Sequence, residues 1–426
     1  MNLTIHPSHL QGRIAIPPSK SHTIRAVFLG LLADGESTLD NPLNSEDTRA
    51  ALRAARALGA EISCTARHWR IRGAGATPRV AAPDLDLANS GTSMRILLGV
   101  ASLVQRGELH VTGDAQLRRR PAAPLLHSLR ELGADIRSTG GEDCPPFLVR
   151  GGLRGGTTKL EAKTSQYVTS LLMACPFAER DSEIRVTHLN EAPYLDITLN
   201  WLKAVGVHLE QDGYLHYRIP GGQTAAPFAR CIPADFSSAT FFLGAGALPN
   251  NNIECNGLDP NDPQPDKKVV DYLETMGADI RPTTKGINTR ARHLRGCEID
   301  MNETPDALPM MAVLGCFAAG ETHLRNVEHA RIKETDRIAA MTCELRKMGA
   351  DIRELQDGMV IRQSALHGAN VDGHADHRIV MALAMAAMAA EHGTTTISTA
   401  EAMNVTFPDF ADLARSLGGT LELSES

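Results

Sequence analysis

Positively charged side chains recur in this chain where helices are expected to begin. Lys20, Arg95 and Arg378 each lie within or just after a short polar segment that leads into an Ala-, Leu- and Met-rich run, and Arg25 and Arg120 lie nearby. A helix N-terminus carries about half a unit of positive charge and free N–H donors, so it attracts anions. Added cations strengthen that attraction, and the pattern predicts small substrates that carry phosphate and carboxylate groups.

A second group of chemically capable residues is the charged run Arg331–Arg337, which holds five charges in seven residues. It precedes an amphipathic stretch, residues 338–345, that we expect to be helical. A charged run is usually a solvated helix face. This one lies in the same repeat as Asp306, however, and a Lys-Glu pair beside a separate aspartate supplies both an acid and a base.

The elements that position these residues follow from a phrase of the type Leu-Gly-Ala-x-Ile, which the chain repeats six times. Its glycines are 69 to 74 residues apart: Gly59, Gly133, Gly206, Gly277, Gly349 and Gly418. Glycine closes a helix in the left-handed conformation, and the alternating residues that follow suit a strand. The period exceeds that of common solenoid repeats, so it predicts six small α+β modules, three in each of two domains.

The polar helix starts recur with the same period, in residues 19–22, 89–93, 163–166, 235–238, 304–306 and 376–378. Ser, Thr, Asp and Asn are also the residues that cap helices through their side-chain oxygens. Any one of these polar residues could therefore be a cap and nothing more. If the six starts converge, they form a strongly electropositive cleft.

Composition excludes several classes of function. The 426 residues are 22% charged and 42% hydrophobic, and the net charge of −7 argues against a nucleic-acid or anionic-membrane surface. No apolar run reaches membrane-spanning length, and the N-terminus lacks a basic region followed by an apolar one, so we expect a cytoplasmic protein. The cysteines show no C-x-x-C pair and the histidines are dispersed, which predicts reduced thiols and no metal site.

Ten phrases carry a resemblance to the enolpyruvyl transferases, most closely to their EPSP synthase branch. They are Pro18-Ser19-Lys20-Ser21 with Arg25, Asn89-Ser90-Gly91-Thr92 with Arg95, Arg120-Pro121, Ser165-Gln166, Pro193-Tyr194, Ser237-Ser238-Ala239, Pro305-Asp306-Ala307, Lys333-Glu334-Thr335-Asp336-Arg337, Asp376-His377-Arg378 and Phe407-Pro408-Asp409. The resemblance implies a two-domain inside-out α/β barrel built of six βαβαββ repeats. It implies a domain I of residues 1–19 plus 234–426, a domain II of residues 20–233, and an active site in the interdomain cleft.

The resemblance also implies an activity and a set of roles. Members move the enolpyruvyl group of phosphoenolpyruvate to the 5-hydroxyl of shikimate 3-phosphate in aromatic amino acid biosynthesis, without metal or cofactor. By similarity Asp306 is the base, and Glu334 and Lys20 are candidates for protonating C3, a choice that the sequence leaves open. The shikimate 3-phosphate set is Lys20, Ser21, Arg25, Thr164, Ser165, Gln166, Asp306, His329 and Lys333; the phosphoenolpyruvate set is Lys20, Gly91, Arg120, Gln166, Arg337 and Arg378.

Four positions depart from the commonest pattern of that family. Val405 replaces a frequent lysine, Thr164 replaces a serine but keeps the hydroxyl, and His329 replaces a frequent asparagine. Glu191 stands where a serine often touches the substrate phosphate. An ionised Glu191 facing phosphate would repel it, so we expect this side chain to turn away or to pair with a cation; the alternative is a different acceptor.

Three other readings are less well supported. The sister enzymes that use UDP-N-acetylglucosamine carry a mobile-loop cysteine, which residues 114–120 lack. A non-catalytic anion-binding protein would not need Asp306 and Glu334 beside arginines. An RNA-end-processing relative is disfavoured by the acidic charge and by the low aromatic content, 4% of residues. We expect small-molecule substrates and a monomer, while sensitivity to the herbicide glyphosate stays open.

Overall fold

The computed structural model, which describes residues 1–425, places a helix end at each of the six glycine phrases. All six glycines have positive φ angles, between +80° and +102°. Glycine adopts this conformation without the steric cost of a Cβ atom. A strand begins two to four residues after each glycine. The predicted helix ends and the strands that follow them are confirmed.

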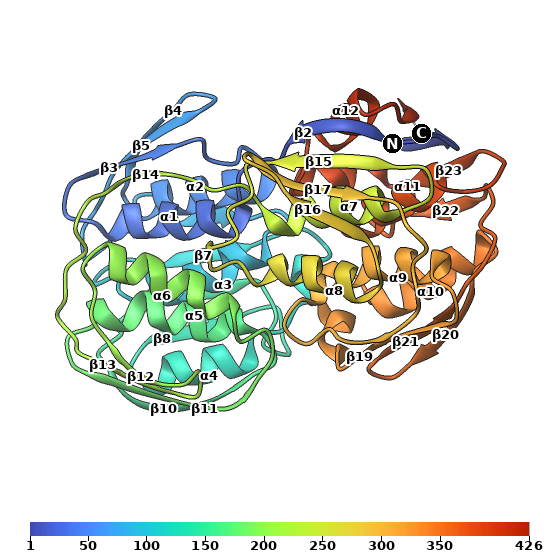
Figure 1. The fold of residues 1–426 in the computed structure, drawn as a ribbon. Coiled ribbons are helices and arrows are strands. Elements are labelled where there is room, and N and C mark those ends of the chain that lie inside the picture. Colours follow the sequence, from blue (N-terminus) through green and yellow to red (C-terminus); the bar gives the residue numbers. More distant parts are fainter. Residues whose placement is uncertain (426) are drawn as a thin grey trace. The chain divides into compact units, whose positions relative to one another are not determined.

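The chain divides into two units (Figure 1). Unit 1 comprises Met1–Pro17 and the chain from Pro233 onward, and unit 2 comprises Pro18–Ile232. The chain passes from one unit to the other twice, at Pro17-Pro18 and at Ile232-Pro233. Proline fixes φ and lacks an N–H donor, so these passages do not continue a strand ladder or a helix.

Unit 2 contains three four-stranded sheets, ordered β14-β3-β5-β4, β6-β7-β9-β8 and β10-β11-β13-β12. The strands are β3 (Glu36–Asp40), β4 (Glu61–Cys64), β5 (His68–Arg72), β6 (Asp84–Asp86), β7 (Leu109–Thr112), β8 (Asp135–Ser138), β9 (Phe147–Gly151), β10 (Gly156–Ala162), β11 (Ser182–Leu189), β12 (Glu210–Asp212), β13 (His216–Ile219) and β14 (Ala229–Cys231). The helices are α1 (Lys20–Leu32), α2 (Glu46–Ala57), α3 (Gly91–Ala101), α4 (Ala123–Glu131), α5 (Ser165–Ala174) and α6 (Tyr194–Ala204), with short 3-10 turns η1 (Leu117–Arg119) and η2 (Cys175–Phe177).

Unit 1 repeats this plan with sheets ordered β22-β23-β1-β24, β16-β17-β15-β2 and β18-β19-β21-β20. Its strands are β1 (Asn2–His6), β2 (Gln11–Ala15), β15 (Asn252–Asn256), β16 (Asp279–Pro282), β17 (Gly286–Arg290), β18 (Glu298–Asp300), β19 (Glu321–Arg325), β20 (Asp351–Leu355), β21 (Gly358–Arg362), β22 (Asn370–Asp372), β23 (Thr395–Ser398) and β24 (Thr420–Ser424). Its helices are α7 (Phe236–Ala247), α8 (Val269–Thr275), α9 (Leu308–Phe317), α10 (Arg337–Lys347), α11 (His377–Met388) and α12 (Phe410–Ser416), with 3-10 turns η3 (Pro265–Lys268), η4 (Pro305–Ala307), η5 (Glu328–Ile332) and η6 (Ala400–Val405).

All six sheets share one topology. In each, the first two strands of the module pair in parallel and the other two neighbouring pairs are antiparallel, as in β6-β7-β9-β8. A helix follows each of the first two strands, so the module is βαβαββ. The N-terminal strand β1 takes the last place in one module of unit 1, between β23 and β24.

Two modules exchange their first strands across the passages between units. Strand β2 pairs with β15 in unit 1, but the chain that leaves β2 enters helix α1 of unit 2. Strand β14 pairs with β3 in unit 2, and the chain that leaves it enters helix α7 of unit 1. Helices α1 and α7 therefore begin directly after the passages.

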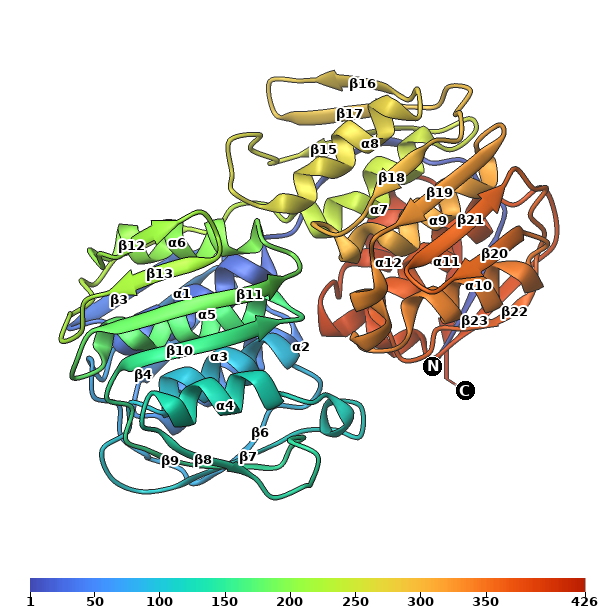
Figure 2. The same cartoon turned by 90° about the horizontal axis from the view of Figure 1, so that it is seen from below.

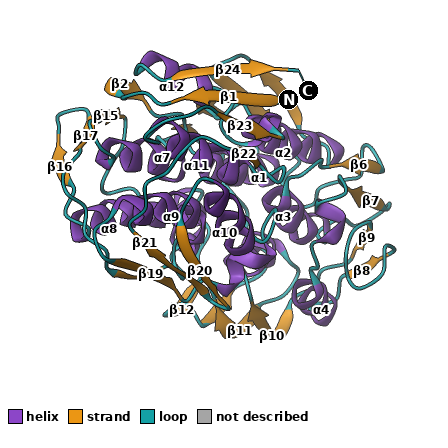
Figure 3. Ribbon diagram, turned by 90° about the vertical axis from the view of Figure 1, so that its right-hand side faces the viewer, coloured by secondary structure: helices purple, strands orange, loops and turns teal. Residues whose placement is uncertain are grey.

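Within each unit the helices lie inside and the sheets lie outside (Figures 2 and 3). Every residue of α7 and of α11 is buried, and α9 is buried except for its last residue, since these helices are apolar on nearly all sides. Helices α3 and α5 pack against each other in unit 2. The predicted fold class, an inside-out α/β arrangement of six modules, is confirmed. None of the helices described has both the length and the apolar character that crossing a bilayer requires.

Candidate active site

The polar segments found in the sequence do begin helices, and several of their residues act as caps. Thr164 caps α5 and Asp235 caps α7. Asp376 caps α11 and Asp336 caps α10. These residues therefore do cap helices, which is one of the two roles that the sequence allowed. The neighbouring cations make further contacts in both units.

Arg337, the first residue of α10, is the centre of a cluster in unit 1. Its side chain is 1% exposed and pairs with three carboxylates. Nε lies 2.8 Å from Asp376 Oδ2, Nη1 lies 2.7 Å from Asp306 Oδ1, and Nη2 lies 2.6 Å from Glu334 Oε2. Burial alone would lower the pKa of Arg337, but Asp376, Glu334 and Asp306 raise it above its ordinary value. The guanidinium is therefore a fixed positive charge.

Arg378 joins the same cluster from α11. Its Nη2 atom lies 2.8 Å from Asp306 Oδ2 and donates to Ser237 Oγ at 2.7 Å. Asp306 thus receives one arginine on each oxygen. Asp376 supports both arginines, because its Oδ1 also accepts the Arg378 backbone N–H at 2.8 Å.

The charged run 331–337 divides between two roles. Arg331 pairs with Asp336 and Glu354 at 2.7 and 2.8 Å and donates to the Leu355 carbonyl, so it fixes the loop to β20. Glu334 and Arg337 belong to the cluster. Lys333 directly precedes Glu334 in the sequence, and it is half-buried. The expectation that the run is more than a solvated helix face is confirmed by the burial of Arg337.

His329 and Val405 complete the candidates of unit 1. His329 is buried, and its Nε2 lies 3.1 Å from the Asn302 carbonyl oxygen. Val405 is half-buried at the end of η6 and offers no charge where the family pattern has a lysine.

In unit 2, Lys20 begins α1 and pairs with Asp47 Oδ2 at 3.1 Å. Both side chains are largely buried. Ser21 follows Lys20, and its carbonyl accepts Arg25 Nη1 at 3.0 Å. Arg25 also donates to Thr198 Oγ1 at 2.8 Å, and burial lowers its pKa to about 10. These contacts hold three predicted residues at one helix start.

Two more arginine side chains, Arg95 and Arg120, lie close to the backbone of Gly91, the first residue of α3. A Cβ atom at this position would lie 2.8 Å from Arg120 Nη1 and 3.1 Å from Arg95 Nη1. Arg120 donates to Asn89 Oδ1 at 2.9 Å, and Arg95 donates to Gln166 Oε1 at 2.7 Å. The absence of a side chain at Gly91 therefore makes room for both guanidiniums.

For Glu191 the structure contradicts one expectation, that the side chain turns away, while pairing with a cation and a different acceptor stay predictions. Its side chain does not turn away: the residue is 2% exposed, and Oε2 accepts from Thr164 Oγ1 at 2.9 Å. The same oxygen lies 3.3 Å from Ser165 Oγ and 3.4 Å from the Ser165 backbone nitrogen. The physical reason is that a buried carboxylate needs donors, and a helix start supplies an N–H and two hydroxyls.

The cations at the helix starts have acidic partners within the chain. Lys20, Arg337 and Arg378 are each paired with a buried or half-buried carboxylate. Sequence reasoning missed Asp47, and it noted Asp376 only as part of a helix start. The available signal was weak: an aspartate at a helix start reads as a cap, and its second partner is set by tertiary structure.

Chemically, the unit 1 cluster combines carboxylates that can exchange protons with guanidiniums that bind anions in a forked geometry. The starts of α1, α3 and α5 in unit 2 offer a lysine, arginines, hydroxyls and an amide side chain. Among residues 1–425, no group of three or more His, Cys, Asp or Glu side chains is arranged to hold a metal ion. None of the eight cysteines of the described residues is in a disulfide.

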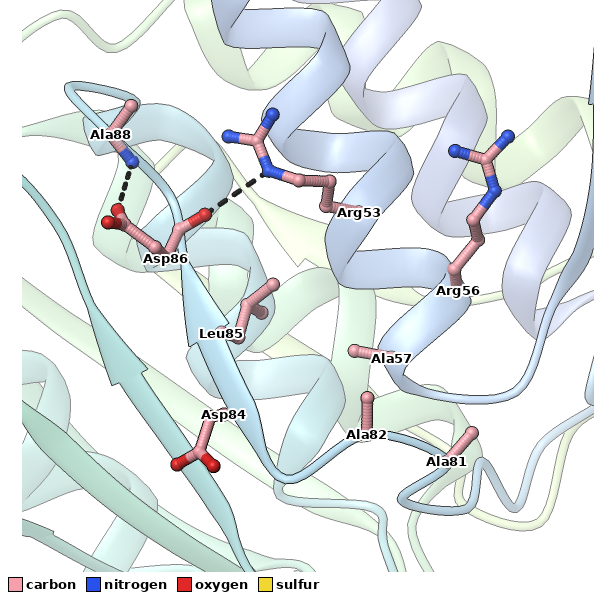
Figure 4. Close-up of a pocket in the computed structure, with 9 residues that line it drawn as sticks. All are labelled: Arg53, Arg56, Ala57, Ala81, Ala82, Asp84, Leu85, Asp86 and Ala88. Carbon is pink, nitrogen blue, oxygen red and sulfur yellow. Dashed lines mark hydrogen bonds between the residues drawn. The ribbon is translucent and has the colours of Figure 1, made fainter.

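One surface hollow of unit 2 has no part in these clusters (Figure 4). It is lined from α2 by Arg53 and Arg56 and from β6 by Asp84, Leu85 and Asp86. Arg53 Nε donates to the Asp86 carbonyl at 3.2 Å, and the Asp86 carboxylate accepts the Ala88 N–H. None of the candidate residues lines it.

Comparisons with known proteins give one consistent result. The family model for EPSP synthase (3-phosphoshikimate 1-carboxyvinyltransferase) matches residues 5–413. The chain is 47% identical over 423 residues to the 3-phosphoshikimate 1-carboxyvinyltransferase of Ruminiclostridium cellulolyticum, covering 99% of this chain and 100% of that one. It is 40% identical over 426 residues to the protein of that name from Methanococcus vannielii, covering 98% of each. A solved EPSP synthase from Acinetobacter baumannii is similar over 100% of both chains, with a TM-score of 0.84 and 29% identity.

Proposed function

The chain belongs to the EPSP synthase family, and from that premise we propose that it transfers the enolpyruvyl group of phosphoenolpyruvate to the 5-hydroxyl of shikimate 3-phosphate, releasing phosphate. The observation that carries the proposal is Asp306, a carboxylate held between two arginines with Glu334 in the same cluster. Such a group places proton-transfer chemistry beside anion binding, which this reaction requires.

The reaction is an addition followed by an elimination. The 5-hydroxyl oxygen forms a bond to C2 of phosphoenolpyruvate and gives up its proton, while C3 gains a proton. The tetrahedral intermediate then loses phosphate from C2 and a proton from C3, which restores the double bond. One base and one acid in position are sufficient, and each typically contributes 10²- to 10⁴-fold in rate.

In unit 1 we assign the base to Asp306. Arg337 and Arg378 contact its two oxygens at 2.7 and 2.8 Å, and these contacts orient the carboxylate. The two arginines are also the phosphoenolpyruvate ligands in this proposal, since guanidinium matches carboxylate and phosphate bidentately. Glu334, on the same guanidinium as Asp306, is one candidate for protonating C3, and His329 and Lys333 serve the acceptor.

In unit 2 we assign Lys20, Ser21, Arg25, Thr164, Ser165 and Gln166 to shikimate 3-phosphate. Gly91 and Arg120 are assigned to phosphoenolpyruvate, with Lys20 and Gln166 serving both substrates. Lys20 is the other candidate for protonating C3. Its Nζ lies 3.1 Å from Asp47 Oδ2, which orients the ammonium group, and an ammonium group can donate a proton.

The test is release of phosphate from phosphoenolpyruvate plus shikimate 3-phosphate, measured in a coupled assay with a metal chelator present. Asp306→Asn keeps the shape of the side chain but removes the base, so kcat should fall by roughly 10²- to 10⁴-fold. Asp271→Asn, which changes an exposed carboxylate of α8 by the same charge, is the matched control and should leave kcat unchanged.

Two results would contradict the proposal. The first is a wild-type protein that does not turn over this substrate pair but uses an unphosphorylated acceptor. The second is an Asp306→Asn variant that retains the wild-type kcat.

We also propose that the protein is a cytoplasmic monomer. Sedimentation of the purified protein at several concentrations tests the oligomeric state, and a concentration-dependent dimer would contradict the monomer.

A further inference from the structure

Glu191 occupies an unusual position in the turn between β11 and α6. Its φ angle is +60°, a left-handed backbone that glutamate rarely adopts, and the turn is closed by its carbonyl, which accepts the Tyr194 N–H at 3.1 Å. The side chain is nonetheless buried, with 2% of the residue exposed. The backbone therefore bends in a way that sends a charged group inward.

The carboxylate meets a set of donors suited to an anion. One oxygen, Oε2, accepts from Thr164 Oγ1 at 2.9 Å and lies 3.3 and 3.4 Å from Ser165 Oγ and N. We call these two residues the Thr164–Ser165 site. It stands at the start of α5, a ten-residue helix, where the helix dipole adds to the attraction. An anionic oxygen that collects an N–H and two hydroxyls at a helix start matches the way a phosphate oxygen is held.

We propose that Glu191 is an internal occupant of the Thr164–Ser165 site, which the phosphate of the acceptor must displace before it binds. This inference rests on the proposed function, which assigns the same donors to that phosphate. A phosphate dianion and a carboxylate cannot share one oxygen position, and side by side they repel. Glu191 is therefore a specificity-determining residue that weakens the binding of the phosphorylated acceptor and leaves phosphoenolpyruvate binding unaffected.

Two variants test this role. Glu191→Asn removes the charge, is too short to reach Thr164, and tolerates a left-handed backbone better than most residues. Glu191→Gln removes the charge and keeps the length. The matched control is Asp196→Asn, which makes the same change of charge in the adjoining helix α6, at a carboxylate that accepts the Tyr214 hydroxyl at 2.8 Å. Thermal melting confirms that each variant folds.

The KM for shikimate 3-phosphate should fall by about tenfold in Glu191→Asn, because the substrate phosphate no longer has to displace a carboxylate from Thr164 and Ser165. Glu191→Gln should show a smaller fall. The KM for phosphoenolpyruvate should stay within about twofold in all variants, and Asp196→Asn should match the wild type. A KM for shikimate 3-phosphate that is unchanged or raised in both Glu191 variants would overturn the proposal.

Direct binding separates this inference from the proposed function. Shikimate 3-phosphate is titrated calorimetrically into each protein without phosphoenolpyruvate. Tighter binding by Glu191→Asn than by wild type supports the internal occupant even where no phosphate is released in the turnover assay, and that absence of turnover counts against the proposed function alone. Equal or weaker binding by both variants overturns the role of Glu191, whatever the turnover.

Discussion

Replacing Asp376 by asparagine should destabilise unit 1 and weaken phosphoenolpyruvate binding together. Asp376 is fully buried, and each of its oxygens has a task. Oδ2 accepts Arg337 Nε at 2.8 Å, while Oδ1 accepts the Arg378 N–H at 2.8 Å and Arg337 Nη2 at 3.4 Å. An amide must place its NH₂ group at one of these two positions, where it meets another donor.

The cost follows from which contact is lost. An NH₂ group at Oδ2 removes a charge-assisted hydrogen bond, worth about 1.5 to 3 kcal/mol; one at Oδ1 removes a helix cap of about 1 kcal/mol and the long contact to Nη2. Arg337 keeps Asp306 and Glu334 at 2.7 and 2.6 Å, so the cost stays below the ~3 to 5 kcal/mol of an unpaired buried charge. We expect a loss of about 2 kcal/mol.

Urea unfolding followed by far-UV circular dichroism measures this loss. With an m-value of about 2 kcal/mol/M, the midpoint should fall by ~1 M. Both tryptophans, Trp69 and Trp201, are buried in unit 2, so their fluorescence reports on that unit and should change less than the dichroism signal. Asp412→Asn is the control, because its pair with Arg415 is exposed and worth about 0 to 1 kcal/mol.

In turnover, Asp376 acts as a positioning residue for Arg337 and for the start of α11. Asp376→Asn should raise the KM for phosphoenolpyruvate by about tenfold, the equivalent of one misplaced charge-assisted contact, and leave the KM for shikimate 3-phosphate within about twofold. An unchanged unfolding midpoint together with an unchanged KM would refute the reasoning, since it would mean that Arg337 is held fully by its other two carboxylates.

Two further predictions test the surroundings of the clusters. Gly91→Ala places a Cβ atom 2.8 Å from Arg120 Nη1, so the guanidinium must move; the KM for phosphoenolpyruvate should rise by about tenfold with little change in the unfolding midpoint, and an unchanged KM would contradict this. Burial would raise the pKa of Glu344, but Lys347, the Asp372 N–H and His374 lower it overall, so this carboxylate stabilises the fold above about pH 4 and that contribution is lost as the pH falls through its lowered pKa. Glu344→Gln should therefore unfold more easily in urea at pH 7 and lose less stability than wild type between pH 7 and pH 3; an equal loss in both proteins would contradict the assignment.

The sequence allowed the modules and the helix starts to be predicted because both depend on local rules. A glycine at a helix end, such as Gly59 or Gly349, needs only the left-handed conformation, and polar residues before an apolar run need only the free N–H groups of a helix start. These requirements are met within a few residues of chain. Six copies at one period then define the architecture.

The partners of the cations could not be predicted, because they are set by packing over long separations in the chain. Arg337 and Asp376 are 39 residues apart, and Lys20 and Asp47 are 27 apart. Nothing in the type or spacing of these residues distinguishes a cap from an ion-pair partner. For Glu191 the expectation that the side chain turns away was wrong for the same reason: its donors, Thr164 and Ser165 at the start of α5, are distant in the chain.

The carboxylates that pair with Arg337 and Arg378 affect how a substrate anion can bind in unit 1. Arg337 and Arg378 could not stay buried as charges without Asp306, Asp376 and Glu334 to balance them. A substrate anion that binds these arginines must therefore take donors from the carboxylates. Asp306 stands to lose contacts on both oxygens, and a carboxylate that gives up cationic donors accepts a proton more readily. Under the proposed assignments, phosphoenolpyruvate that binds Arg337 and Arg378 therefore frees the Asp306 carboxylate to accept the proton of the acceptor hydroxyl.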